Sequence, residues 1–131
     1  MHTGDRLPRV VIAEDDDDMR NVLCELVSAL GVEVAAASSG GDLILLLTDD
    51  GPVDLLITDV RMPWMTGFQV ALSARNSGLG VPIIIVTAFP DEALRAQVEN
   101  LGRAVLLAKP FRPEELLSLV RARLPAAAAS T

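Results

Sequence analysis

The sequence predicts a doubly wound α/β fold, in which helices cover both faces of a five-stranded parallel sheet. Short β-branched or aliphatic runs alternate five times with longer segments of helical character. Strict alternation of this kind implies parallel strands joined by right-handed crossovers. The third and fourth runs are almost entirely apolar, as expected for central strands covered on both sides. A length of 131 residues, 50% of them apolar, fits one small domain with a single core.

Each expected strand is a short apolar run that ends at a turn. The expected strands are Arg9–Ala13, Val32–Ala36, Val53–Thr58, Val81–Thr87 and Ala104–Ala108. We expect the first helix from about Asp17 to Leu30, because apolar residues recur at helical spacing up to Gly31. The last helix is expected to begin at Pro113. It has acids in its first turn and Arg121 and Arg123 near its end, an order that suits the helix dipole.

The second helical segment contains an unusually apolar run from Leu43 to Leu47. Successive helical residues are rotated by about 100°, so these side chains cannot all face one core. At least one of them is therefore expected to be exposed. An exposed apolar side chain is compatible with an ordinary surface or with a surface for a partner.

Composition excludes several classes of protein. The net charge is −7, and the five acids of the run Glu14–Asp18 account for most of it, so the remaining residues are near charge balance; the basic residues are scattered. The basic residues form no continuous stripe that could bind nucleic acid, so we expect no nucleic-acid binding by this chain alone. No apolar stretch approaches the roughly 20 residues of a membrane span, and the first residues lack the apolar core of a signal peptide. We therefore expect a cytoplasmic location without membrane contact.

The domain is expected to comprise residues 1–124. Residues 125–131, PAAAAST, form a proline-broken, low-complexity tail that is either a true terminus or the start of a linker. The single cysteine, Cys24, lies in a helical pattern and is expected to be a core residue.

Polar residues at the strand exits predict a functional site, because ligands of such sheets bind beyond the carboxyl ends of the strands. The residues at these exits carry carboxylates, a hydroxyl and an ammonium: Glu14, Asp15, Asp59, Thr87 and Lys109. Carboxylates from neighbouring strand ends, together with a backbone carbonyl, make a hard oxygen site that suits Mg²⁺.

Asp59 is also a competent nucleophile toward a phosphoryl group, provided that cations neutralise the oxygens of the transition state. Mg²⁺, Lys109 and Thr87 are the candidates for that role. The residues therefore predict phosphoryl transfer onto Asp59.

The order of these motifs resembles the receiver domain of response regulators, the phosphoacceptor module of two-component signalling. The most specific segment is D-V-R-M-P-W-M-T-G, Asp59 to Gly67, which is similar to the family's D-x-x-M-P-x-M-x-G. V-T-A (Val86–Ala88) and K-P-F (Lys109–Phe111) add to it, and the resemblance extends from Arg9 to about Leu124. It implies a flavodoxin-like (βα)5 fold with strand order 2-1-3-4-5.

The resemblance also implies a role for each residue of the acidic cluster. Asp59 would be the phosphorylation site. Glu14 and Asp15 would be the acidic pair that binds Mg²⁺ together with Asp59 and the backbone carbonyl of Arg61. The other acids, Asp16–Asp18, are instead expected to face the dipole of the first helix and solvent.

Thr87 and Lys109 would be the phosphate-sensing and phosphate-binding residues, and the Lys109–Pro110 bond is expected to be cis. Many family members have Tyr or Phe three residues before this lysine, where this chain has Leu106. The usual switch, in which an aromatic ring turns inward, is therefore expected to be weaker.

The partner implied by the resemblance is a sensor histidine kinase or a phosphotransfer protein that donates the phosphoryl group. The chain would not be an enzyme, although it would assist its own phosphorylation and dephosphorylation. Its signal would leave through the face formed by the fourth helix, the strand Ala104–Ala108 and the last helix. An effector protein or a second copy of the chain would bind there.

Two other classes of protein compete with this interpretation. Phosphatases of the haloacid-dehalogenase type need a second aspartate two residues after the nucleophile, and that position is Arg61 here. This argues against a phosphatase. A phosphorylation-independent interaction module would be expected to have lost the acids, Thr87 or Lys109, and none is lost.

Overall fold

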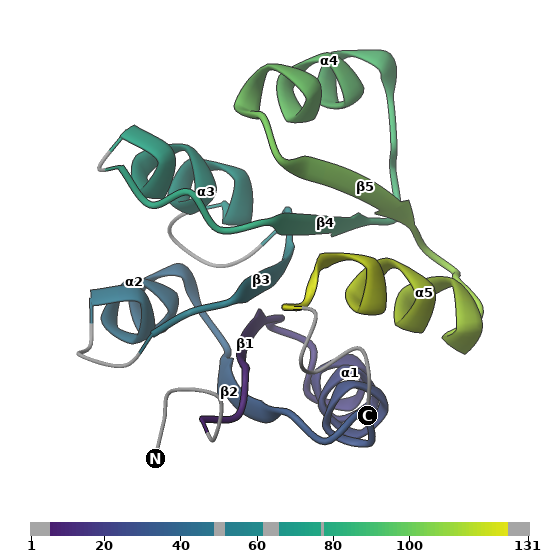
Figure 1. Cartoon of the computed structure of the whole chain (residues 1–131). Coiled ribbons are helices and arrows are strands. Elements are labelled where there is room, and N and C mark those ends of the chain that lie inside the picture. The colour runs from purple at the N-terminus through teal and green to yellow at the C-terminus, as the bar shows by residue number, and fades with distance from the viewer. Residues whose placement is uncertain (1–5, 49–51, 62–65, 77, 126–131) are drawn as a thin grey trace.

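The five-stranded parallel sheet lies between two layers of helices (Figure 1). The structure is a computed structural model, and it describes residues 6–48, 52–61, 66–76 and 78–125. The strand order is β2-β1-β3-β4-β5, and all four pairings are parallel. This confirms the doubly wound fold and the strand order that the resemblance implied.

Strands and helices alternate along the whole described chain. The strands are β1 (Arg9–Ala13), β2 (Glu33–Ala37), β3 (Leu55–Asp59), β4 (Ile83–Thr87) and β5 (Ala104–Ala108). The helices are α1 (Asp17–Ser28), α2 (Gly40–Thr48), α3 (Gly67–Asn76), α4 (Glu92–Leu101) and α5 (Pro113–Arg123).

Some bounds differ from those expected. β2 begins one residue later, and β3 and β4 begin at Leu55 and Ile83, because the ladders start where Val10 pairs with Leu55 and Leu56 pairs with Ile83. Helix α1 ends at Ser28, since the chain then tightens and reaches Gly31 with φ +82°. That backbone conformation favours glycine.

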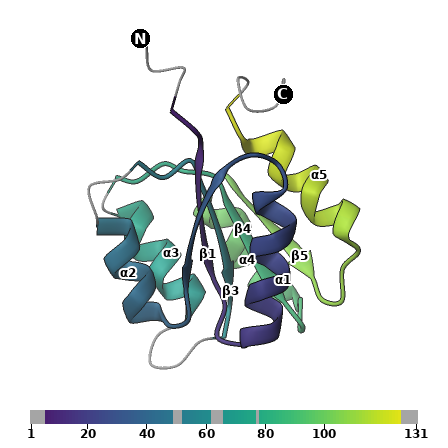
Figure 2. The ribbon, with the colours of Figure 1, turned by 90° about the horizontal axis from the view of Figure 1, so that it is seen from below.

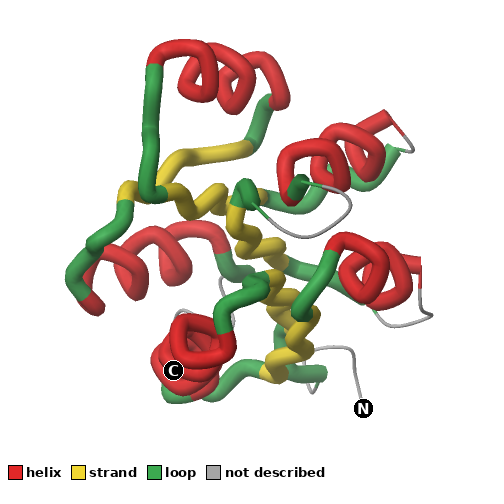
Figure 3. The backbone as a smooth tube through the Cα atoms, turned by 180° about the vertical axis from the view of Figure 1, so that it is seen from behind, coloured by secondary structure: helices red, strands yellow, loops and turns green. Residues whose placement is uncertain are grey.

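The sheet separates two layers of helices (Figure 3). The core is accordingly divided into two clusters of buried side chains, one under each layer. Helices α2, α3 and α4 cover one face, and α1 and α5 cover the other. Strands β1, β3 and β4 are buried along their whole length, as expected for central strands. Side chains that alternate along these strands therefore supply both clusters.

The apolar run in α2 is divided between core and surface. Leu43 is fully buried, whereas Ile44 and Leu45 are 37% and 68% exposed. This confirms the expectation that at least one side chain of the run is exposed.

The two edges of the sheet carry different groups. We call the end where the strands finish, after Ala13, Asp59, Thr87 and Ala108, the carboxyl edge, and the opposite end, where β1 begins and α5 ends, the amino edge (Figure 2). Among the described residues, no helix is both long and apolar enough to cross a membrane.

Candidate functional site

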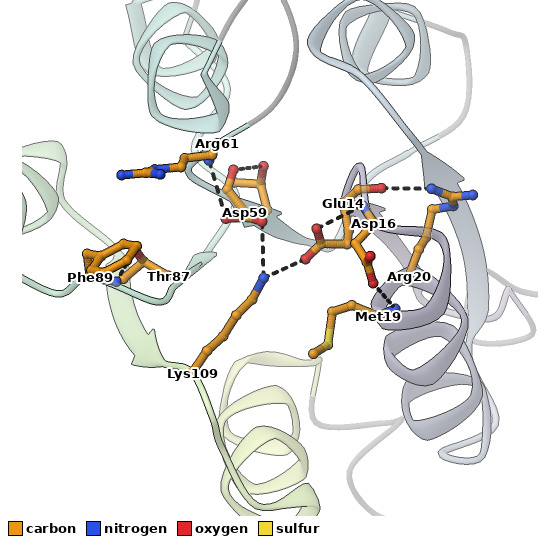
Figure 4. Close-up of polar contacts among 10 residues, drawn as sticks. Glu14, Asp16, Met19, Arg20, Asp59, Arg61, Thr87, Phe89 and Lys109 are labelled. Atoms are coloured by element: carbon orange, nitrogen blue, oxygen red, sulfur yellow. Dashed lines mark hydrogen bonds and ion pairs between the residues drawn. The ribbon is translucent and has the colours of Figure 1, made fainter.

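The carboxyl edge brings together residues that are far apart in the sequence. β1 lies beside β3, with Ala13 opposite Thr58, so Glu14 comes next to Asp59. Lys109 directly follows β5 and reaches across to both carboxylates (Figure 4). Parallel strands thus gather the predicted residues at one edge.

Glu14 is a buried acid with several fixed partners. Its exposed fraction is 1%, its Oε1 accepts from Lys109 Nζ at 2.9 Å, and its Oε2 accepts from the backbone N–H of Asp16 at 3.2 Å. Arg20 donates to its backbone carbonyl at 2.9 Å. Burial raises the pKa of Glu14 to about 7, although the bond from Lys109 acts in the opposite direction.

Lys109 is the counterion of two carboxylates. Its ammonium lies 2.9 Å from Glu14 Oε1 and 3.1 Å from Asp59 Oδ2. Burial acts to lower the pKa of Lys109, but the hydrogen bonds to Glu14 and Asp59 and their charges outweigh it, so the pKa is raised. The Lys109 backbone N–H bonds to Thr87 O at 2.7 Å, and the Lys109–Pro110 peptide is cis, as expected.

Three carboxyl groups converge at this edge. One oxygen from each of Glu14, Asp15 and Asp59 lies within 4.8 Å of the others. Asp15 is exposed, whereas the other two are buried, so the cluster opens toward solvent on the side of Asp15. Only hard oxygen donors are present in it, and these are the ligands that Mg²⁺ prefers. The cluster could therefore hold a divalent cation.

The remaining acids of the run belong to helix α1. The side chain of Asp16 caps the helix by accepting from Met19 N at 2.7 Å, and Asp17 pairs with Arg20. Asp17 and Asp18 lie in the first turn, where they face the dipole. This division of the acidic run agrees with the sequence expectation.

The loops after β3 and β4 meet above the site. The Arg61 backbone N–H donates to Asp59 Oδ1 at 3.3 Å, and the Thr87 hydroxyl accepts from the Phe89 N–H at 3.1 Å. The Arg61 guanidinium lies 4.9 Å from the centre of the Phe89 ring. Thr87 itself is buried, one residue beyond Val86, which is opposite Asp59 in the β3–β4 ladder.

Some site features were not expected from the sequence. The bond from Lys109 to Glu14 and the bond from Arg20 to the Glu14 carbonyl depend on side-chain reach, for which the sequence carries no signal. The stacking of Arg61 on Phe89 has a weak signal, since each residue lies two places beyond a site residue. Residues 62–65 of the D-x-x-M-P-x-M-x-G segment, which include Trp64, lie outside the described residues.

Leu106 occupies the position where the resemblance implied an aromatic ring. It is half-buried in β5 opposite Ile85, and it packs against the core cluster on the α2–α4 side of the sheet.

Fold and site together define an α/β domain of the receiver type: a (βα)5 sheet with an acidic cluster and a lysine at its carboxyl edge. The response regulator receiver domain model matches residues 10–121. The chain therefore belongs to the receiver domain family of two-component response regulators.

Two curated relatives are named as response regulators. Response regulator protein TodT of Pseudomonas putida is 33% identical over 123 residues, which cover 94% of this chain and 54% of TodT. Response regulator MprA of Mycolicibacterium vanbaalenii is 34% identical over 116 residues, which cover 88% of this chain and 50% of MprA. The chain thus spans about half the length of the curated relatives it matches.

Solved structures share the fold. Chemotaxis response regulator CheY4 of Vibrio cholerae superposes with a TM-score of 0.81 at 27% identity, over 90% of this chain and 99% of CheY4. The signal receiver domain of an HD domain-containing protein from Pseudomonas fluorescens Pf-5 gives a TM-score of 0.82 at 26% identity, over 90% and 94% of the two chains.

Proposed function

We propose that this chain accepts a phosphoryl group on Asp59 from a histidine kinase or a phosphotransfer protein. One observation carries the proposal: the Asp59 carboxylate stands beside the Lys109 ammonium and within 4.8 Å of two further carboxylates. A nucleophile, a cation and a candidate metal site are thus adjacent. In this proposal residues 1–124 form a cytoplasmic receiver, and residues 125–131 are a tail or the start of a linker.

The reaction exchanges one bond to phosphorus for another. A carboxylate oxygen of Asp59 attacks the phosphorus of a phosphohistidine, a P–O bond forms, and the P–N bond breaks. The imidazole keeps the electron pair of that bond and takes a proton from water. Negative charge on the phosphoryl oxygens must be neutralised in the transition state. Lys109 lies 3.1 Å from Asp59 Oδ2 and is placed to donate to one of these oxygens, with the Thr87 hydroxyl as a second donor.

Mg²⁺ fits the oxygen donors of the acidic cluster. Glu14, Asp15 and Asp59 would supply carboxylate oxygens, and Arg61 would supply its backbone carbonyl. When bound, the ion adds positive charge next to the phosphoryl oxygens. Asp15 is the exposed member of the cluster, so its carboxylate is the one an ion reaches first from solvent.

The rival functions receive less support. A phosphatase of the haloacid-dehalogenase type would need an aspartate at position 61. The residue there is Arg61, whose guanidinium stacks on Phe89 and provides no carboxyl group. A phosphorylation-independent module would have no need of a buried carboxylate paired with a lysine at this edge, because burying charged groups is costly.

Labelling by a small phosphodonor tests the proposal. We expect acetyl phosphate with Mg²⁺ to add one phosphoryl group to the wild-type chain, measured by intact mass. Asp59→Asn should abolish the labelling, because an amide is not a nucleophile of this kind. Asp54→Asn is the matched control, since Asp54 lies just before the same strand at the opposite edge, and it should be labelled normally. Labelling of Asp59→Asn at the wild-type rate would refute the assignment.

We further propose that the signal passes to an effector protein through the α4–β5–α5 face. The coupling between phosphorylation of Asp59 and the conformation of this face should be weak. Leu106 can remain half-buried in both states, so the free-energy difference between them is small, and only such a difference shifts populations. Output would depend more on the loop after Thr87 and on α4, which buries a narrow stripe of Leu94, Val98 and Leu101.

Amide hydrogen exchange with and without a beryllofluoride phosphate mimic tests this coupling. We expect the main protection changes in the loop after Thr87 and in α4. Large changes centred on residues 105–108 that vanish in Leu106→Ala would show that the leucine acts as the switch.

A further inference from the structure

Among the residues that the structure describes, the surface formed by α2 and α3, which we call the α2–α3 face, is mostly apolar and carries few charges. Asp42 is the one charged residue within α2, and it lies in the first turn. Arg75 is the one charged residue within α3, and its guanidinium is engaged by backbone carbonyls of Leu79, Gly102 and Arg103. By contrast, exposed acidic and basic side chains are frequent along α4 and α5.

A pocket of about 160 Å³ lies between these two helices. Its lining is mostly apolar and includes Ile44, Leu47, Val70, Ala74 and Leu79. An apolar cavity of ~150 Å³ accepts a benzene-sized group. The pocket therefore has room for one leucine side chain.

Apolar side chains project from the same face. Leu45 and Leu72 are 68% and 43% exposed, and Ile44, in the pocket wall, is 37% exposed. Leu45 comes two residues after the fully buried Leu43 in α2, about 200° further around the helix, so its side chain points away from the core. Helices α2 and α3 lie side by side in the same helical layer (Figure 1). A protruding leucine and a pocket of matching size thus share one face. Such a surface is complementary to itself, as a two-fold interface requires.

We propose that the α2–α3 face is a self-association surface, on which Leu45 of each copy enters the pocket of the other. The net charge of −7 opposes association of two copies. The acidic run lies at the start of α1, in the other helical layer, so the α2–α3 face avoids most of this repulsion. A partner protein with a charged surface would find few charges to pair with on the α2–α3 face.

The dimer should be weak and independent of phosphorylation. Few side chains contribute exposed apolar area, which places the contact at the small end of specific interfaces. None of the pocket residues belongs to the acidic cluster, so association leaves the carboxyl edge free for a phosphodonor.

Sedimentation equilibrium of the unphosphorylated chain in EDTA tests the proposal. We expect the weight-average mass to rise from the monomer toward the dimer between about 5 and about 500 µM, the range of weak complexes. Leu45→Glu should weaken the dimer at least tenfold, because the charge is introduced twice into one interface. Val22→Glu is the matched control: Val22 is 45% exposed on α1, and its substitution should leave the dissociation constant unchanged.

A second variant separates docking into the pocket from general stickiness. Ala74→Phe adds apolar surface but fills the pocket, so we expect it to weaken the dimer, whereas nonspecific association would strengthen. NMR dilution of the wild-type chain, which needs no substitution, should move amide signals of α2 and α3 and leave those of α1 unmoved. A wild-type chain that stays monomeric over this concentration range overturns the proposal. That result is expected if a different protein binds the α2–α3 face. A dimer that survives Leu45→Glu, as one through α4–β5–α5 would, also overturns it.

Discussion

The amino edge and the carboxyl edge of the sheet both carry charged side chains, but they differ in how these side chains are paired. At the amino edge, Asp54 accepts from the backbone N–H of Arg9 at 2.8 Å and from Arg6 at 3.1 Å. Arg75 donates to Leu79 O and Gly102 O, each at 2.8 Å. At the carboxyl edge, three carboxyl groups lie close together, and Lys109 pairs with two of them, Glu14 and Asp59.

This difference separates charges that hold the fold from charges that are available to a ligand. The bonds from Arg6 and the Arg9 N–H outweigh the desolvation of Asp54, so this carboxylate stabilises the native state. The Arg75 guanidinium is held by backbone carbonyls of the chain itself. The carboxyl edge keeps an excess of negative charge after Lys109 has been counted, and a cation from solvent would reduce it. Variants at the two edges should therefore affect different measurements.

Removal of the lysine at the carboxyl edge should have the largest effect. We expect Lys109→Met to slow phosphorylation by acetyl phosphate about 100-fold, the typical effect of removing one group that stabilises transition-state charge. The matched change at the amino edge is Arg103→Met, which removes a bond to Gly80 O and should leave the rate within about twofold of wild type, since it leaves every transition-state contact in place. Stopped-flow phosphorylation assays measure both. Equal slowing in the two variants would contradict the division between the edges.

Loss of the carboxylate at the amino edge should reduce stability and leave phosphorylation unchanged. Asp54→Ala removes a charged acceptor from the Arg9 N–H and should lower the free energy of unfolding by about 2 kcal/mol. Urea unfolding measures this change. Glu99→Ala, which removes an exposed carboxylate of α4, is the control and should be near neutral.

The contribution of Asp54 should also depend on pH. Burial acts to raise the pKa of Asp54, but the bonds from Arg6 and the Arg9 N–H outweigh it, so the folded-state pKa is lowered. The stabilisation is therefore complete above the unfolded-state pKa of about 3.9 and is lost as the pH falls through the folded-state value. The difference in unfolding free energy between wild type and Asp54→Ala should shrink below about pH 4. A difference that stays constant in acid would contradict this pKa shift.

A smaller effect is expected from the stacked pair above the site. We expect Arg61→Ala and Phe89→Ala each to speed dephosphorylation about two- to fivefold, because an exposed cation–π contact is worth ~0.5–1 kcal/mol. The double variant should resemble either single variant, since each removes the same contact. Loss of the phosphoryl group over time is measured by intact mass. Unchanged rates in all three variants would exclude a role for the pair.

The topology and the meeting of Glu14 with Asp59 could be predicted from the sequence. Alternating elements determine a parallel sheet, and parallel strands bring their exits to one edge. The sequence predicts beginnings of β3 and β4 that are too early, because Val53 and Val81 continue the apolar runs before pairing begins. The clamp of Arg75 on Gly102 was not predictable, since a basic residue at a helix end equally suits the dipole. Gly102 and Arg103, whose carbonyls accept from Arg75, are 27 and 28 positions away in the chain.

The most direct test of the difference between the edges is the gain in unfolding free energy on adding Mg²⁺. A ligand that binds only the native state at 100 times its dissociation constant stabilises by about 2.7 kcal/mol. We predict that Asp54→Ala, although less stable, keeps the wild-type gain and that Asp15→Ala loses most of it. Asp17→Ala, in the same acidic run, should keep the gain because Asp17 pairs with Arg20. Equal gains in Asp15→Ala and Asp17→Ala, or no gain in the wild-type chain, would contradict a cation site at the carboxyl edge.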